Sequence, residues 1–456
     1  MEGQELVGGR KLVGTYYGYV MTLNDNGASQ MRAHYATKRF LDAHPVDFVM
    51  SPQAYPIRRL GGTCCDMKPF KSFTDHGIVS VIENDTRTHN ITSRRTQLLT
   101  EEQSVAALRR DMGIALCRCQ PFYTYALCGG TEFDFPAFAH DAAELRRVAE
   151  HALVRNSGRH AEIAYVVSEE SIKAQPMLKV SADRYAEAWQ SYRPDGTVER
   201  GDDMLGVPLA SEPYKLIYTR LSRIGAPVDY LLAEDLADNP GDYKLYVFGC
   251  CTKPTPALVK TMAAVRKRSC TILWTGAPGY VSREGNSVAN MKALTGADFE
   301  RVKGPVDPGV RMKDGTLAGA TQNPIAPVFC LAQPDEVFGV YANGQPGLAA
   351  VRTDAARTVF SGSHRVELPF LRRLAAEAGV FIYSDSTDPM EASDCFFTLH
   401  ARFGGRKTVR LPKKTDVYDV FARRMVARGV DSFSFNAPLH TSHLFYFGDD
   451  ASKLAR

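Results

Sequence analysis

The alternation of short apolar runs with helical stretches constrains the fold of this chain more than any other feature. In the first third, strands are predicted at Lys11–Tyr19, Val46–Ser51, Ile78–Ile82 and Ala115–Tyr125. Helices are predicted between them at Ala28–Ala43 and Glu101–Asp111. The second of these has a capping box, with Thr100 before it and Gln103 three residues on. Strands that alternate with helices form parallel βαβ units, so a parallel α/β fold is predicted.

Two further units follow this series. A helical pattern at Ala139–Val154 ends at a break at 156–159, which is the predicted domain boundary. A second series of strands and helices follows, with helices predicted at Tyr214–Ile224, Pro256–Arg268 and Val366–Ala378. Its apolar runs predict an open parallel sheet and lie at Ala161–Val167, Val228–Leu232, Lys244–Phe248, Thr271–Trp274, Val337–Tyr341 and Thr358–Ser361. From Ser384 the pattern changes to short strands, predicted at Phe396–Arg402, Lys407–Leu411 and Ser442–Phe447, with Gly404-Gly405 as a hairpin turn between the first two. The predicted domains are therefore 1–155, 156–383 and 384–456.

Composition excludes several classes of protein. The chain has 55 Lys and Arg against 51 Asp and Glu, an evenly spread net charge of +4, so neither nucleic acid nor membrane is an expected partner. No apolar run approaches the roughly 20 residues of a membrane helix, and the first eleven residues lack the apolar core of a signal peptide. The ten cysteines form no C-x-x-C pair, so a reduced, cytoplasmic protein is predicted.

The end of the third predicted strand is the strongest candidate for chemistry. The apolar run Ile78–Ile82 leads directly into Glu83, Asn84 and Asp85, with Arg87 close behind. Barrel and doubly wound folds place their active sites at such carboxyl ends of strands. Arg87 is expected to hold the carboxylate ionised, because a cation within about 4–6 Å lowers the pKa of a carboxylate by 1–3 units. The pattern alone fits a nucleophilic carboxylate and a structural ion-pair network equally well.

Aromatic residues end the neighbouring strands and favour a sugar substrate. They are Tyr16, Tyr17, Tyr19, Tyr55, Phe122, Tyr123 and Tyr125. A sugar ring presents an apolar C–H face rimmed by hydroxyls, which suits aromatic platforms with polar groups around them. The predicted substrate-binding residues are Tyr17, Tyr19, Tyr55, Asp85, Arg87 and Tyr123.

These segments resemble clan A glycoside hydrolases, and family 42 β-galactosidases in particular. The first third is similar to the second half of their (β/α)8 TIM barrel, through the tyrosine-rich strand end, Ser51-Pro52-x-x-Tyr55, Val81–Arg87 and Phe122–Asp134. The middle resembles their flavodoxin-like class I glutamine-amidotransferase-like domain, also called the trimerisation domain, through Arg223–Tyr230, Asp242–Phe248 and Leu273–Gly279. The tail is similar to their small C-terminal antiparallel β-domain, through Phe397–Ala401 and Leu411-Pro412.

The resemblance implies retaining hydrolysis of a β-galactoside. Glu83 stands where the family carries its nucleophile, at the end of barrel strand seven, and the acid/base belongs at the end of strand four. The first strand of this chain matches strand five, so the acid/base half of the barrel is not recognised in it. A fragment of a longer enzyme, with little activity alone, is expected in preference to a shortened gene product or a half completed by another chain. No cofactor is implied, and a homotrimer is the implied assembly.

Three alternatives remain open at this point. Cys250 and Cys251 follow an apolar strand as in cysteine-dependent amidotransferases, with His364 and Glu367 downstream, although the second glycine of the nucleophile turn is absent. Cys117, Cys119 and Cys128 form a weak metal-binding pattern that fits small residues filling a barrel better. The last two units also fit a non-catalytic oligomerisation or carbohydrate-binding module.

Overall fold

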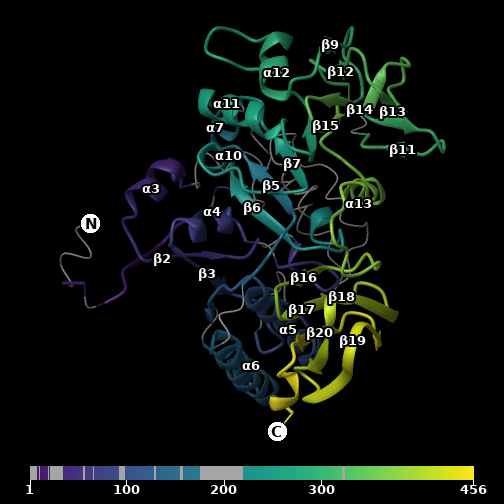
Figure 1. Ribbon diagram of the computed structural model, residues 1–456. Helices are drawn as coiled ribbons and strands as arrows, with labels where there is room; N and C mark the ends of the chain where they lie inside the picture. The colour runs from purple at the N-terminus through teal and green to yellow at the C-terminus, as the bar shows by residue number, and fades with distance from the viewer. Residues whose placement is uncertain are drawn as a thin grey trace.

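The computed structural model describes residues 8–9, 11–18, 20, 34–54, 57–64, 66–91, 98–127, 130–154, 158–174, 219–320 and 324–455. Within this part of the chain the strands form sheets of four, nine, two and five strands. Figure 1 shows the nine-stranded sheet in the upper half and the five-stranded sheet at the lower right, with the four-stranded sheet at the left between them. The predicted α/β architecture with a separate small antiparallel β-domain is confirmed.

The four-stranded sheet is parallel, and its strands follow one another in chain order. The strands are β1 (Gly14–Tyr16), β2 (Phe48–Pro52), β3 (Val79–Asn84) and β4 (Phe122–Thr124). The helices between them are α3 (Thr37–Ala43), α4 (Phe70–Asp75) and α5 (Glu101–Cys117), and α6 (Pro136–Val154) follows β4. This arrangement is the repeated βα unit that the sequence predicts.

Helix α5 is longer than the sequence pattern predicts. Its N-terminus has the predicted cap, since Thr100 Oγ1 accepts a hydrogen bond from the Gln103 amide at 3.3 Å. The prediction of a strand from Ala115 is wrong, because α5 continues to Cys117 before the chain turns at Cys119 in the left-handed region, φ 54°. Ala115 packs toward β3, and Cys117 packs toward the five-stranded sheet. Because this end of the helix is buried on both sides, its apolar run cannot be told from a strand by periodicity. Similarly, the helix predicted from Ala28 begins, within the described residues, at Thr37.

The nine-stranded sheet is mixed. Five parallel strands lie in the order β6-β5-β7-β8-β15, the flavodoxin order, and four antiparallel strands extend the sheet beyond β15. The parallel strands are β5 (Ile163–Val167), β6 (Val228–Leu232), β7 (Leu245–Cys250), β8 (Thr271–Thr275) and β15 (Ala356–Ser361). The antiparallel strands are β10 (Val310–Met312), β11 (Leu317–Ala318), β13 (Glu336–Val340) and β14 (Pro346–Thr353). The wholly parallel sheet predicted from the run at Val337 is wrong, because the turns joining β13, β14 and β15 are too short for a parallel crossover.

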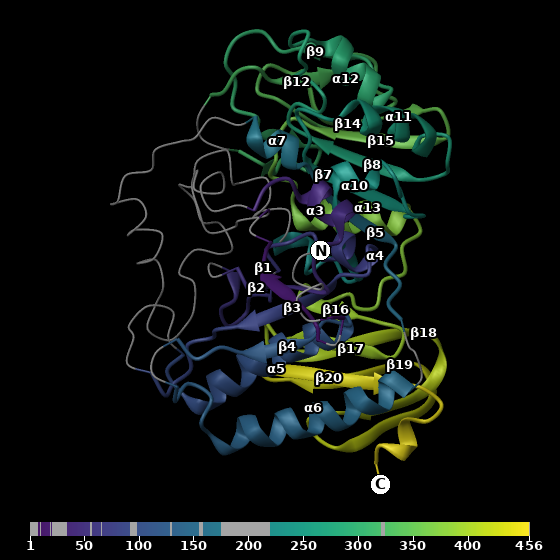
Figure 2. The same ribbon diagram turned by 90° about the vertical axis from the view of Figure 1, so that its left-hand side faces the viewer.

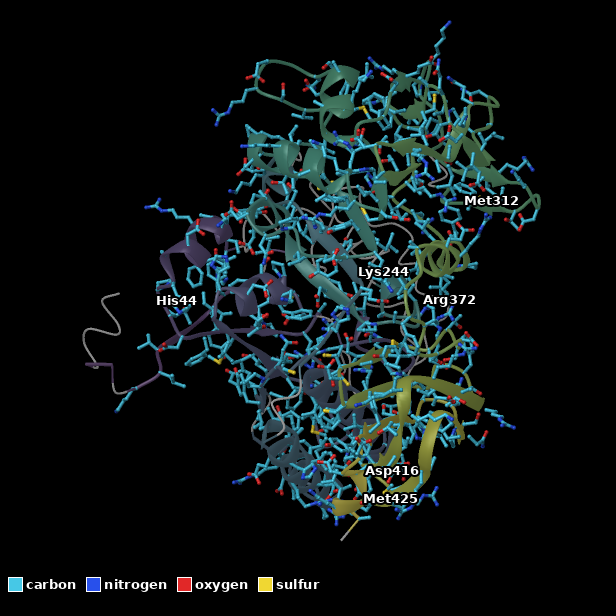
Figure 3. The ribbon with its side chains drawn as sticks, viewed as in Figure 1. His44, Lys244, Met312, Arg372, Asp416 and Met425 are labelled. Atoms are coloured by element: carbon cyan, nitrogen blue, oxygen red, sulfur yellow. The ribbon has the colours of Figure 1, made fainter. Side chains whose placement is uncertain are left out.

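Short helices and a small ribbon accompany this sheet. The helices are α7 (Glu169–Lys173), α10 (Ala233–Leu236), α11 (Pro256–Val265), α12 (Val288–Thr295) and α13 (Leu368–Glu377), and the ribbon pairs β9 (Phe299–Arg301) with β12 (Phe329–Leu331). Arg372 of α13, labelled in Figure 3, ties this unit to the segment that leads to the five-stranded sheet. Its guanidinium donates to the carbonyl oxygens of Arg223, Ser384 and Ser386, each at 3.0 Å.

The five-stranded sheet is antiparallel, in the order β16-β17-β20-β18-β19. Its strands are β16 (Met390–Ala392), β17 (Phe396–His400), β18 (Gly405–Asp419), β19 (Arg424–Ala437) and β20 (Ser442–Phe447), and a short helix, η3 (Ala451–Lys453), follows. The predicted hairpin at Gly404-Gly405 is wrong, because β17 pairs with β16 and β20 and not with β18. The hairpin is instead β18–β19, whose two strands are far longer than the apolar runs suggest.

Helices α4 and α5 cover one face of the four-stranded sheet, called here the outer face, and the opposite face is called the inner face. The nine-stranded and the five-stranded sheets both pack against the helices of the outer face. Helix α5 lies on the five-stranded sheet, where Leu108 and Met112 share a core with Phe396 and Leu444. Helix α4 lies on β6, and the rings of Phe70 and Tyr230 are 5.7 Å apart. The opposite face of the four-stranded sheet therefore receives neither of the other sheets.

Candidate active site

Glu83 lies on the inner face of the four-stranded sheet, at the carboxyl end of β3. In register it stands between Pro52 of β2 and Tyr123 of β4. Side chains alternate along a strand, so Val79, Val81 and Glu83 share this inner face. Ile82 points to the outer face, into a core with Ile114 and Ala115 of α5. The strand pattern thus places the predicted nucleophile on the face that the helices leave open.

Two tyrosines hold the Glu83 carboxylate. The Tyr123 hydroxyl donates to Glu83 Oε2 at 2.5 Å, and the Tyr16 hydroxyl lies 2.6 Å from that of Tyr123. Burial raises the pKa of Tyr123, and the hydrogen bond to Glu83 raises it further. Burial likewise raises the pKa of Tyr16. Both phenols therefore stay protonated at neutral pH, and Tyr123 is the donor to a carboxylate that is 6% exposed.

Asp85 has a partner that the sequence did not predict. Its carboxylate forms a buried ion pair with Arg58, whose Nη2 also donates to the Asp85 carbonyl oxygen at 3.2 Å. Arg58 comes from the loop after β2 and was not predicted from the sequence to lie beside Asp85. This buried ion pair fixes Asp85 and the loop after β2 relative to the end of β3.

A buried polar network fixes the backbone around this strand end. Asn84 Nδ2 donates to Asp111 at 2.8 Å, and Arg110 Nε donates to the same carboxylate at 2.7 Å. The Arg110 guanidinium also donates to the carbonyl oxygens of Arg58 and Arg59 at 2.6 and 2.5 Å. Charge-assisted hydrogen bonds of this kind are about twice as strong as neutral ones. They hold the loop after β2 against α5, which in turn sets the position of β3.

The structure does not bring all of the remaining predicted site residues to Glu83. Tyr123 contacts Glu83 as described, but Tyr17 points into the core, stacked on Phe40 with ring centroids 4.2 Å apart. The Tyr17 hydroxyl donates to the Tyr35 carbonyl oxygen at 3.1 Å. Arg87 is half-buried. Tyr19 and Tyr55 lie outside the described residues.

Two residues at the site were not assigned to it from the sequence. Tyr16 is one of the aromatic residues at the first strand end, and strand alternation puts it on the opposite face from Tyr17. Its register neighbours are Met50 and, one strand further, Val81, which share the face of Glu83. Period-2 alternation was thus the signal that selects Tyr16. Arg58 carries no such signal, because a loop brings it to Asp85.

The cysteine site of the alternative hypothesis is poorly suited to nucleophilic catalysis. Cys250 ends β7, and both Cys250 and Cys251 are 1% exposed. Burial raises the pKa of the Cys251 thiol well above its ordinary value, so the thiolate is disfavoured. Burial also lowers the pKa of His364 to about 4, and Nδ1 of this residue lies 3.1 Å from the Gly249 carbonyl oxygen. The arrangement is that of a neutral thiol and a neutral imidazole.

The structure does not support the metal site considered at Cys117, Cys119 and Cys128. Cys117 lies in α5 rather than on a barrel strand, and Cys128 is outside the described residues. Across the described ranges, no group of three or more His, Cys, Asp or Glu side chains is placed to hold a metal ion. In the same ranges, no helix combines the length and the apolar character needed to cross a membrane.

Comparison with solved structures identifies the fold. The β-galactosidase of the psychrophilic Marinomonas ef1 aligns with 97% of this chain at a TM-score of 0.57 and 10% identity, over 65% of its own length. The cold-adapted β-galactosidase of Rahnella sp. R3 aligns with 90% of this chain (TM-score 0.54, 14% identity, 61% of its length). A catalytic mutant of Gan42B, a GH42 β-galactosidase from G. stearothermophilus, aligns with 88% of this chain at a TM-score of 0.51 and 12% identity, over 63% of its own length.

The chain therefore has a β-galactosidase-like glycoside hydrolase fold. It spans 61–65% of the length of these three proteins, less than two thirds. No family model matches the sequence, and no curated protein matches it. At 10–14% identity the likeness concerns the fold, and the chemistry has to be argued from the residues of this chain.

Proposed function

We propose that this chain carries the nucleophile half of a retaining glycoside hydrolase that acts on a β-galactoside. The observation that carries the proposal is the position of Glu83, at the carboxyl end of a parallel strand, with Tyr123 donating to its carboxylate at 2.5 Å. The β-galactosidase-like fold supports this assignment. The sugar is proposed by analogy with the proteins that share the fold.

In the proposed reaction, an oxygen of Glu83 attacks the anomeric carbon of the sugar. The bond from this carbon to the aglycone oxygen breaks, the aglycone leaves with the electron pair, and a glycosyl ester of Glu83 remains until water cleaves it. Tyr123 orients the carboxylate before attack. A retaining enzyme also needs a second carboxyl group about 5–5.5 Å from the first, to protonate the leaving group.

The two steps can be separated by the choice of substrate. A dinitrophenolate leaving group needs no protonation, so it reports on the nucleophile without the acid/base. Incubation with 2,4-dinitrophenyl 2-deoxy-2-fluoro-β-galactoside should attach one fluorosugar to the chain, and peptide mass spectrometry should find it on Glu83. The fluorine slows hydrolysis of the ester, so the adduct accumulates.

Matched variants make this test specific. Glu83→Gln removes the nucleophile while keeping its shape, and it should abolish the adduct. Glu150→Gln removes a carboxylate from the exposed surface of α6, where Glu150 pairs with Arg146, and should leave labelling unchanged. An adduct on another residue, or equal labelling of the wild type and of Glu83→Gln, would refute the assignment of Glu83.

A further inference from the structure

We infer that the exposed face of the β18–β19 hairpin binds a polysaccharide that carries sulfate or carboxylate groups. The charge of the hairpin indicates an anionic ligand, and the polar side chains between the charges indicate a glycan. The choice of a glycan also rests on the function proposed above, whereas the affinity for anions does not. Every residue from 324 to 455 belongs to the described part of the chain, and this range contains the whole five-stranded sheet.

The positive charge of the chain is concentrated in this hairpin. Residues 402–428 contain nine Lys or Arg residues and two Asp residues, a net charge of +7, although the whole chain has a net charge of +4. The even spread of charge expected from the whole-chain balance is therefore wrong for this segment. A surface with one dominant sign of charge attracts ligands of the opposite sign, so the hairpin is complementary to a polyanion.

Strand pairing sets part of this charge on one flat face. In Figure 1 the hairpin lies at the right-hand margin of the lower half. Val409 and Phe433, on the side that packs in the core, are 0% and 7% exposed. Directly paired residues point to the same side of a sheet, so the neighbours of these two residues face solvent together. This cationic face consists of three register pairs, all exposed or half-buried: Arg406 with Asn436, Thr408 with Ser434, and Arg410 with Ser432.

Several cations of the hairpin are available to a ligand. Arg410 pairs with Asp385, but Arg406 forms no ion pair within the described residues. The ladder is irregular between Arg410 and Thr415, and the exposed Lys413 and Lys414 lie in this interruption. Across the same described ranges, neither lysine has an ionic partner. Because protein carboxylates do not compete for these three cations, each can donate charge-assisted hydrogen bonds to a sulfate or carboxylate.

The side chains between the charges favour a glycan over other polyanions. The hydroxyl oxygens of Thr408 and Ser434 lie 2.9 Å apart, and Ser432 and Asn436 add a hydroxyl and an amide. Such groups both donate and accept hydrogen bonds, which suits the hydroxyls of a sugar. The cationic face has no aromatic side chain on which the bases of a single-stranded nucleic acid could stack. It also has no large apolar side chain of the kind that enters a membrane surface.

The spacing of the charges suits an extended chain. Residues two apart on a strand are about 6.6–6.8 Å apart, so Arg406 and Arg410 stand about 13–14 Å apart along β18. The hydroxyl groups of Thr408 and Ser434 lie between them. A polysaccharide laid along the strand can therefore contact the two cations with anionic groups on different sugars and the hydroxyl pair with the sugars between.

Binding of three dextrans to the purified full chain tests this inference. Dextran sulfate, carboxymethyl dextran and uncharged dextran share one backbone, so they separate the effect of charge from that of the sugar. Both anionic dextrans should bind, and dextran should not. Raising the NaCl concentration from about 50 to about 200 mM should weaken binding by at least about tenfold, because salt screens exposed charges.

Charge reversal locates the surface. A triple variant with Arg406→Glu, Lys413→Glu and Lys414→Glu should lower the affinity for dextran sulfate by at least about tenfold. The matched control is a variant that changes the net charge equally, at exposed residues outside the hairpin: Lys267→Glu, Arg283→Glu and Lys303→Glu. Its affinity should stay within about twofold of the wild type. Circular dichroism confirms that both variants are folded.

Removal of the hydroxyl pair tests the choice of a glycan. Thr408→Ala combined with Ser434→Ala leaves the charge unchanged. It should lower the affinity for dextran sulfate by about three- to tenfold, because the sugar hydroxyls lose their partners. Its affinity for polyglutamate, which has no sugar hydroxyls, should equal that of the wild type. Equal effects on both ligands would overturn the glycan as the occupant.

The remaining outcomes also decide the inference. A wild-type chain that binds neither anionic dextran, or equal losses in the two triple variants, would overturn it. Duplex DNA or polyglutamate that binds more tightly than dextran sulfate at the same salt concentration would assign the surface to another polyanion. The fluorosugar test is separate. Labelling of Glu83 without binding of an anionic dextran defeats this inference alone, whereas an adduct on another residue, with binding lost only in the hairpin variant, defeats the hydrolase assignment alone.

Discussion

The hydroxyl oxygens of Tyr16 and Tyr123 lie 2.6 Å apart, although these residues belong to the first and last strands of the four-stranded sheet. Neighbouring strands lie about 4.8 Å apart, so the two edges of a flat sheet would be too distant for this contact. The sheet is therefore curled, and Figure 2, turned toward the side where β1 to β3 lie, shows the four strands in order. The contact also completes a chain of hydroxyl groups that ends on the Glu83 carboxylate.

Replacement of Tyr123 by Phe should slow the labelling of Glu83 by about ten- to a hundredfold. The change removes a hydrogen bond to a charged group, which is worth about 1.5–3 kcal/mol, and each 1.4 kcal/mol is about tenfold in rate. The measurement is the rate of fluorosugar attachment followed by intact mass. Tyr16→Phe should also slow labelling, because the Tyr16 hydroxyl lies 2.6 Å from that of Tyr123 and its pKa is raised by burial and in part by Glu83.

Tyr17→Phe is the matched control for both variants. It removes the same hydroxyl from the next residue, but that hydroxyl donates to the Tyr35 carbonyl oxygen in the core. Its labelling rate should equal that of the wild type. Equal rates for Tyr123→Phe and Tyr17→Phe would show that Tyr123 does not position the carboxylate.

Replacement of Glu391 by Gln should lower the free energy of unfolding by about 3–5 kcal/mol. Glu391, on β16, accepts from Arg118 at 2.8 Å and from Arg159 at 3.1 Å, and all three side chains are buried. Removal of one partner from a buried ion pair is strongly destabilising, and Glu391 is the shared partner of two buried arginines. Arg159 also pairs with Asp229 on β6, so the network joins the three larger sheets. Urea unfolding followed by circular dichroism measures the change.

The exposed pair of Arg410 and Asp385 provides the comparison. Surface ion pairs contribute about 0–1 kcal/mol, so Asp385→Asn should change the unfolding free energy by less than 1 kcal/mol. Equal losses for Asp385→Asn and Glu391→Gln would mean that burial of the Glu391 network does not control stability.

Stability should fall as the pH drops below about 6.5, in part because of His400. This residue is 1% exposed, its Nε2 accepts from the Gly61 amide at 2.7 Å, and its Nδ1 lies 2.7 Å from Ser442 Oγ, which itself donates to the Ala106 carbonyl oxygen. The ring is thus held neutral with its proton on Nδ1. Burial, and then the nearby Arg110, lower the pKa of His400 well below its ordinary value.

The sign follows from proton binding. Below about pH 6.5 the unfolded chain protonates this imidazole while the folded chain does not, so the stabilisation present at neutral pH is lost on acidification by about 1.4 kcal/mol per pH unit. Burial lowers the pKa of His443 to about 4, which adds a loss in the same direction. His400→Gln should reduce the slope of unfolding free energy between pH 6.5 and 5.5 by one proton. His44→Gln, at an exposed helix end, should leave the slope unchanged, and equal slopes in both variants would contradict the role of His400.

Local patterns determined much of this protein from the sequence. Apolar runs predicted β3 and the parallel strands of the larger sheet. The latter are buried on both faces and are therefore apolar throughout. Thr100 and Gln103 gave the start of α5, because the capping hydrogen bond depends on residues only three apart. The position of Glu83 at the carboxyl end of β3 followed from the same local pattern.

The tertiary structure decided which of those residues meet. Tyr16 and Tyr17 are adjacent in sequence, yet one reaches the Glu83 site and the other packs in the core on Phe40. Arg58 pairs with Asp85 across 27 residues, and Glu391 meets Arg118 across 273, separations at which the sequence carries no periodic signal. Local propensity and periodicity are encoded within a few residues, whereas pairings between distant side chains depend on how the strands curl and the sheets pack together.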